Sequence, residues 1–261
     1  MNKHFTVEVK PNIPGNHQAA GGAAYGAKDV LFDWTAIQVP KGASKLTGIT
    51  ATLRGTDGGA ASNGKDFDIV FAKSINNIAP ATLGNAGATV SAAPIVANHI
   101  IGFAHVDETG GFGNEGFDFF HVCAAGTGAA ANLMPNLVLE GEHQSGDNVG
   151  YDTIYVGGIV GGAGISFGTT VLVRGAITAD NTVTIPTDKG NNDDPNAEVI
   201  FAVGDVLETG TGDTVGTVAS ISAFDTDHQD IILTEKNVEA IANNEELFNV
   251  NPIRLILSFE K

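Results

Sequence analysis

Short runs of β-branched and aromatic residues recur along the sequence, and clusters of Gly, Asn and Asp separate them. Such runs are typical of strands, and such clusters are typical of turns. The chain contains 34 glycines, and a glycine inside a helix costs about 1 kcal/mol relative to alanine. This pattern therefore predicts many short strands joined by turns and argues against a helical fold.

Several of the runs alternate between apolar and polar residues. Phe5, Val7 and Val9 follow this rule, and so do Phe67, Ile69 and Phe71 as well as Leu137 and Leu139. A period of two places the apolar side chains on one face of a strand. We therefore expect an all-β protein, built as a jelly-roll-like β-sandwich with a small inserted β-unit near the C-terminus. The candidate strands cover residues 4–10, 30–39, 45–55, 66–74, 98–106, 116–123, 136–143, 152–160, 169–178, 205–210, 214–222, 229–234 and 253–260.

A change of composition begins near Ala179, where the sequence becomes polar and acidic and contains Pro186 and Pro195. We expect residues 1–178 to form the sandwich, completed by a final strand within residues 251–261. Residues 179–250 are expected to form the small acidic β-unit. We also expect one or two helical turns after Thr234, with Val238, Ile241 and Ala242 on one side. The final strand is expected to pair beside residues 169–178.

The charge of the chain is strongly acidic and unevenly distributed. The formal net charge is −17, and residues 176–261 hold 16 acids and 4 bases, against 14 and 9 in residues 1–175. Such a surface repels a phosphate backbone and an anionic lipid surface, so we expect no direct nucleic-acid or membrane partner. It is compatible with a solvated acidic coat or with docking on a basic protein surface.

Cys123 is the one cysteine of the sequence, so no internal disulfide can form, and its apolar neighbours indicate a small buried residue. The N-terminus has no apolar signal region and already has the pattern of a strand. No apolar run approaches the ~18 residues that indicate a membrane-spanning helix. We therefore expect neither a secretion signal nor a membrane span.

Two glycine-rich stretches invite comparison with phosphate-binding loops. Gly210 and Gly212 are followed by Gly216, one residue too far along, with no nearby lysine and with a strand-like stretch after them. This stretch predicts a hairpin between residues 204–209 and 214–221. Gly111, Gly113 and Gly116 match the spacing G-x-G-x-x-G but lead into an aromatic, strand-like segment, so we expect no nucleotide site there.

Asp225, Asp227 and Asp230 lie close together, with His228 between them. A Ca²⁺ ion needs several oxygen ligands from a folded loop, and the spacing of an EF-hand is absent. A solvated turn is the preferred interpretation, and a loop cation site is the alternative. Residues 105–108 and 140–143 raise the same question. Ser145 lacks the setting of a nucleophile, so we assign no catalytic, cofactor-binding or metal-binding residue and expect no cofactor.

Long segments that are rich in Ala and Gly and poor in charge separate some of the strands. On a β-scaffold such segments cover neighbouring subunits or pack on a partner, or else they form mobile surface loops. These segments are residues 16–29, 55–65, 75–97 and 124–135.

Residues 198–261 resemble small β-units of tailed-phage virion proteins, in particular capsid decoration (cement) proteins of marine and cyanobacterial phages. The resemblance rests on "VGDVL", "GTVASIS", "DIILT" and "NPIRLIL", with a short turn and an acidic loop between them. It implies a non-enzymatic protein of the outer capsid surface, made in the host cytoplasm. The implied partners are the major capsid protein and further copies of the chain, as a homotrimer.

Two other functions remain open from the sequence. A receptor- or glycan-binding β-module of a tail or fibre requires exposed aromatic rings beside Asp and Asn in a concave site. A hydrolase on a β-sandwich requires converging carboxylates, at least one with a raised pKa. The candidate aromatic residues are Tyr25, Tyr151, Tyr155 and Trp34, the last more consistent with a core position.

Overall fold

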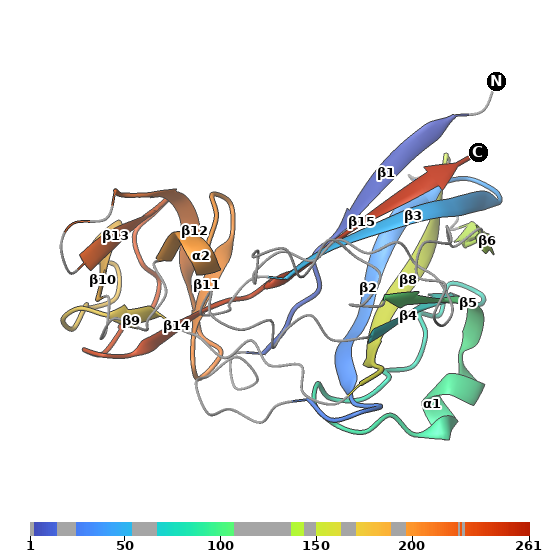
Figure 1. Ribbon diagram of the computed structural model, residues 1–261, viewed down its shortest axis with the longest axis horizontal. Coiled ribbons are helices and arrows are strands. Elements are labelled where there is room, and N and C mark those ends of the chain that lie inside the picture. Colours follow the sequence, from blue (N-terminus) through green and yellow to red (C-terminus); the bar gives the residue numbers. More distant parts are fainter. Residues whose placement is uncertain are drawn as a thin grey trace.

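The computed structural model describes residues 3–14, 25–53, 67–106, 137–143, 150–162, 171–188, 197–223, 225 and 228–261. Within these ranges almost all regular structure is β, in three antiparallel sheets (Figure 1). The predicted β class is therefore confirmed. The two helices of these ranges are short: α1 (Ala92–Ala97) and α2 (Ala197–Ile200).

Two of the sheets contain the strands of the N-terminal part together with the last strand. The first sheet has the order β1-β15-β3-β6 and the second the order β2-β8-β4-β5, with β7 pairing to β8. The strands of the first sheet are β1 (His4–Val9), β15 (Ile253–Glu260), β3 (Ser44–Leu53) and β6 (Leu137–Leu139). Those of the second are β2 (Val30–Pro40), β8 (Tyr151–Val160), β4 (Phe67–Lys73), β5 (His99–Val106) and β7 (Glu142–His143).

The inner faces of these two sheets share one hydrophobic core. Phe67, Ile69 and Phe71 of β4 are all fully buried, as the alternation of that strand requires. Phe5 of β1 stacks on Phe259 of β15, with ring centroids 5.1 Å apart. The apolar positions of period two thus mark the face of β4 that is turned toward the shared core.

The third sheet is a closed barrel with the order β10-β13-β12-β11-β14-β9 and a core of its own. Closure leaves no free sheet edge, which suits short strands that lack a second sheet to cover them. In Figure 1 the barrel lies at one end of the molecule and α1 at the other. Its strands are β9 (Val171–Val173), β10 (Thr184–Asp188), β11 (Val206–Thr209), β12 (Thr214–Ile221), β13 (His228–Leu233) and β14 (Glu246–Asn249).

The predicted hairpin is present. β11 pairs antiparallel with β12, and Gly212 between them has a φ of +88°, which a glycine adopts without steric cost. The glycines of this stretch therefore serve a turn.

Two predictions about the acidic part are wrong. β15 pairs with β1 and β3, whereas residues 171–173 lie in the barrel between β10 and β14. No helix follows Thr234: Val238 is 58% exposed, and Ile241 forms a β-bridge with Ile177. In both places pairing with a distant segment replaced the arrangement that the local sequence indicated.

Two of the strands and both of the described helices, α2 included, were not predicted from the sequence. β10 lies in the segment interpreted as a polar crossing, β14 lies where helical turns were expected, and α1 lies in a segment expected to be loop. The division of the chain at residues 178/179 and 250/251 stays a prediction. β9 belongs to the barrel, although it precedes the first of these two positions.

Candidate functional site

Residues 74–98, which we call the strap, connect β4 to β5 and include α1. The strap covers part of the outer face of the second sheet, the face turned away from the shared core. Val70 lies on this face between the core residues Ile69 and Phe71, yet it is fully buried. Leu83 of the strap is 2% exposed, so it packs beneath the strap.

Gly157 of β8 makes room for this packing. A Cβ atom at this position would lie 2.6 Å from Cδ1 of Leu83 and 3.1 Å from the ring of Trp34. Both distances are shorter than ordinary van der Waals contact. The absence of a side chain at residue 157 therefore allows the strap to lie close against the sheet.

Two carboxylates at the start of β2 hold the middle of the strap. Asp33 accepts hydrogen bonds from Thr82 Oγ1 at 2.6 Å and from the Leu83 N–H at 2.9 Å. Asp29 accepts one from Thr89 Oγ1 at 3.0 Å and forms a β-bridge with the same residue. Hydrogen bonds to ionised acceptors are roughly twice as strong as neutral ones, so these acids act as clamps.

A third carboxylate holds the first turn of the strap. Glu142 of β7 accepts hydrogen bonds from the N–H groups of Asn76 (2.7 Å) and Asn77 (3.1 Å). Both asparagines have positive φ, 52° and 62°, which asparagine tolerates better than most residues. Desolvation acts to raise the pKa of Glu142, but the Ser74 side chain, these two N–H groups and the charge of Lys73 outweigh it, so the pKa lies below its usual value.

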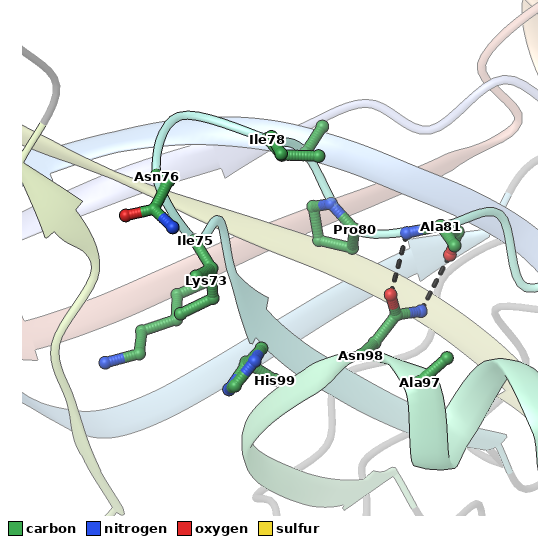
Figure 2. Close-up of a pocket in the computed structure, with 10 residues that line it drawn as sticks. Lys73, Ile75, Asn76, Ile78, Pro80, Ala81, Ala97, Asn98 and His99 are labelled. Atoms are coloured by element: carbon green, nitrogen blue, oxygen red, sulfur yellow. Dashed lines mark hydrogen bonds between the residues drawn. The ribbon is translucent and has the colours of Figure 1, made fainter.

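Asn98 holds the end of the strap by pairing with Ala81 (Figure 2). Its Oδ1 accepts from the Ala81 N–H, and its Nδ2 donates to the Ala81 carbonyl, both at 2.7 Å. Trp34 Nε1 donates to the same carbonyl at 2.8 Å. The side chain of Trp34 is half-buried between the sheet and the strap. The sequence favoured a core position for Trp34, but this residue does not belong to the shared core.

The strap contains a pocket of about 280 Å³. In Figure 2 Ile78 and Pro80 stand on the side of the first turn, and Ala97 and Asn98 stand at the end of α1. Lys73 and His99, which face each other in the β4–β5 ladder, supply its basic groups. The lining residues are Lys73, Ile75, Asn76, Ile78, Ala79, Pro80, Ala81, Ala97, Asn98 and His99, so the described lining contains no Trp, Tyr or Phe ring.

The strap itself is uncharged, and the surface around this pocket is partly apolar, with Lys73 and His99 as the basic groups of the pocket lining. No Asp, Glu, Lys, Arg or His occurs in residues 74–98. Ile78 is 72% exposed and Val96 is 82% exposed. Phe103 of β5, opposite Val70 in the ladder and thus on the same side of the sheet, is 56% exposed. We use the name strap face for the surface formed by the pocket together with Ile78, Val96 and Phe103.

The candidate aromatic residues for sugar binding do not gather at the pocket. Tyr25 is buried, and this burial, with the nearby charge of Asp29, raises the pKa of its phenol. Tyr151 is half exposed at the start of β8, and Tyr155 is half-buried further along the same strand. Trp34 is the residue of this set for which a hydrogen bond to the strap is found in the described ranges, from its Nε1 to the Ala81 carbonyl.

The acidic stretch at the start of β13 forms a tight turn in its described part. The backbones of Asp225 and His228 exchange hydrogen bonds of 3.0 and 2.7 Å. Asp227 lies outside the described residues. No group of three His, Cys, Asp or Glu side chains arranged to hold a metal ion is found in the part of the chain that the structure describes.

The histidines of the other two acidic motifs each lie beside an aspartate. His105 Nδ1 is 2.7 Å from Asp68 Oδ1 across the β4–β5 ladder. His143 Nδ1 is 3.4 Å from the buried Asp152, whose other oxygen accepts from the Gly42 N–H at 2.6 Å. Cys123, Ser145, Glu108 and Gly111, Gly113 and Gly116 lie outside the described residues.

Sequence reasoning did not find the clamping roles of Asp29, Asp33 and Glu142. Asp29 and Asp33 belong to no motif in the sequence, and Glu142 was noted only within residues 140–143 as part of a possible cation site. Glu142 meets its partners 66 and 65 residues away. The one signal in the sequence was the uncharged stretch 75–97 itself.

Neither helix in the described ranges has the length and apolar character needed to cross a bilayer. No protein-family model matches the chain, and no curated protein matches its sequence.

Proposed function

We propose that this protein is a non-enzymatic structural component of a virion, which binds the outer surface of the capsid as an oligomer and stabilises the shell. The observation that carries the proposal is the partition of charge along the molecule. Residues 176–261, which include most of the barrel, have 16 acids and 4 bases, whereas the strap has no charged residue. Figure 1 places the barrel and α1 of the strap at opposite ends.

This separation of an acidic part from an uncharged part is suited to a protein that lies between the capsid lattice and solvent. An acidic end stays hydrated, or docks on a basic patch of the major capsid protein. An uncharged, partly apolar end is the kind of surface that protein–protein contacts cover. A protein that binds the assembled shell more tightly than it binds the separate capsid subunits shifts the assembly equilibrium toward the shell.

The fold of the two-sheet part supports the proposal, and we infer that it is a jelly roll. If β1, β2, β3, β4, β5, β6, β8 and β15 are numbered one to eight, the sheets have the orders 1-8-3-6 and 2-7-4-5. Strand one then pairs with eight, two with seven, three with six and four with five. A long hairpin wrapped into two sheets gives this order, and jelly rolls occur in viral capsid and lectin domains.

The described carboxylates of the strap region also fit a structural role. Asp29, Asp33 and Glu142 direct their oxygens to N–H and O–H groups of this protein. These acids therefore hold a surface in shape, and we assign the surface, rather than a reacting group, as the functional element.

The experiment that tests the proposal is quantitative mass spectrometry of purified, DNA-filled particles from the source. We expect a copy number of the same order as that of the major capsid protein. A few copies per particle would move the protein to a tail or fibre and favour the receptor- or glycan-binding alternative. Complete absence from particles would overturn the virion proposal.

A further inference from the structure

We infer that the strap face is the surface through which copies of this chain associate with one another. The inference rests on the proposed oligomer and names the surface that forms it. The partner is a second copy of the chain, and the contact involves Ile78, Val96 and Phe103 around the pocket.

Charge is the first argument for a second copy as the partner. Each copy carries a formal net charge of −17, so two copies repel one another over most of their surfaces. Like charges placed opposite each other across an interface cost several kcal/mol. The strap has 25 residues without a single charge, so it offers a surface on which identical acidic molecules repel one another less.

The second argument is that the strap is held in place before any partner arrives. Asp33, Asp29, Glu142 and Asn98 each hydrogen-bond to it at a different point. A surface that is already ordered loses little conformational entropy on association, and this raises affinity. The same bonds direct the carboxylates of Asp29, Asp33 and Glu142 toward the strap.

The third argument is the shape and chemistry of the strap face. The side chains of Ile78 and Val96 project into solvent at 72% and 82% exposure, beside a pocket of about 280 Å³. β5, which carries Phe103, is the last strand of the second sheet. Exposed apolar side chains beside a pocket are buried when two copies associate, and so is the edge strand of a sheet.

The test is analytical ultracentrifugation of the purified full chain and of an I78D/V96D variant over a series of concentrations. We expect the wild type to self-associate. In the variant we expect at least about a 100-fold weaker association, because each new carboxylate would be buried without a partner. Far-UV circular dichroism and the unfolding midpoint check that the variant is folded.

The matched control is V203D/V238D, which places the same two charges on exposed apolar positions of the barrel. Val203 is 69% exposed and Val238 is 58% exposed. We expect this variant to associate like the wild type. The inference is overturned if the wild type is monomeric, if I78D/V96D associates normally, or if both variants lose association equally.

These outcomes are separate from the test of the proposed function, because ultracentrifugation uses no particles. A monomeric protein found in many copies on the capsid would overturn the inference alone. A strap-dependent oligomer that is absent from particles would overturn the virion proposal alone.

Discussion

Arg254 of β15 donates a hydrogen bond from Nη2 to Oδ1 of Asp205 at 3.2 Å, and this contact fastens the first sheet to the barrel side of the molecule. Asp205 is 4% exposed. Its Oδ2 accepts from the Ala202 N–H and from Asn249 Nδ2, both at 2.8 Å. Arg254 Nε also lies 3.0 Å from Glu8 Oε1. One guanidinium therefore joins β1, β15 and the segment that leads into β11.

Replacing this arginine should destabilise the fold. In R254A the carboxylate of Asp205 stays buried and loses its cation, and breaking such a pair typically costs about 3 to 5 kcal/mol. Because the Arg254 side chain is 31% exposed, water can replace part of the lost interaction. We therefore expect a loss of about 2 to 3 kcal/mol in the free energy of unfolding, measured by urea denaturation.

The matched control is E8A, which removes the other partner of Arg254. The Glu8 side chain is 46% exposed, and exposed ion pairs contribute about 0 to 1 kcal/mol. We expect E8A to unfold nearly like the wild type. An equal loss of unfolding free energy in R254A and E8A would show that the contact with Asp205 stabilises the fold no more than the contact with Glu8 does.

Filling the space at Gly157 should lift the strap from the sheet. G157V places a branched side chain where even a Cβ lies 2.6 Å from Leu83, and overpacking costs about 1 to 3 kcal/mol. Trp34 is the one tryptophan of the chain and contacts the strap. We therefore expect a red shift of its fluorescence in the folded state together with a lower unfolding midpoint.

The control for this change is G150V, since a Cβ at Gly150 meets nothing within 4 Å. We expect its tryptophan spectrum to match that of the wild type and its stability to change by less than about 0.5 kcal/mol. An unchanged spectrum in G157V would mean that the strap does not depend on the glycine.

The clamp at Glu142 should make the strap sensitive to acid. Its pKa in the folded state lies below the unfolded value of 4.5. The stabilisation is therefore present above pH 4.5 and is lost as the pH falls through the folded pKa. We expect the unfolding midpoint of the wild type to fall more steeply below pH 4.5 than that of E142Q, which carries no titrating group at this position.

E140Q provides the comparison for this titration, because Glu140 is exposed two residues before Glu142. The pH profile of E140Q should follow the wild type. If the profiles of E142Q and the wild type run parallel through the acid range, Glu142 does not hold the strap through its charge.

Tyr25 should make the fold sensitive to alkali. Burial, with the nearby Asp29, raises the pKa of its phenol above the unfolded value of 10.0. The stabilisation is therefore complete below pH 10.0 and is lost as the pH rises above it. We expect Y25F to lose stability less steeply than the wild type above pH 10.0, measured as the unfolding midpoint against pH. Identical curves would contradict this assignment.

Salt should strengthen the association of copies through the strap face. The Debye length falls from about 10 Å at 0.1 M salt to about 3 Å at 1 M, and repulsion between molecules of net charge −17 falls with it. We expect the dissociation constant, measured by ultracentrifugation, to decrease as sodium chloride is added. An increase would indicate an interface built on opposite charges.

Local patterns in the sequence predicted most strands correctly. The alternation in Phe67, Ile69 and Phe71 marked the face of β4 that enters the shared core, because a period of two leaves only two choices. The hairpin of β11 and β12 followed from glycines that permit a tight turn. In both cases the deciding contacts lie within a few residues of one another.

Pairing between distant segments could not be predicted in the same way. The apolar run of β15 is equally suited to several neighbours, and only the assembled fold selects β1 and β3. The strap shows the same limit: its lack of charge is visible in the sequence, but its clamps are not. Asp33 meets Leu83 across 50 residues, and no local rule connects them.

The position of β15 between β1 and β3 has a consequence for the order of folding. During synthesis, β1 and β3 leave the ribosome long before residues 253–260 exist, so the first sheet lacks its second strand until then. The barrel strands, from residue 171 to residue 249, are all made earlier, and each of them pairs only with other strands of this range. The barrel can therefore close while β1 and β3 still present unpaired edges, and the nascent chain is exposed to aggregation through these two strands.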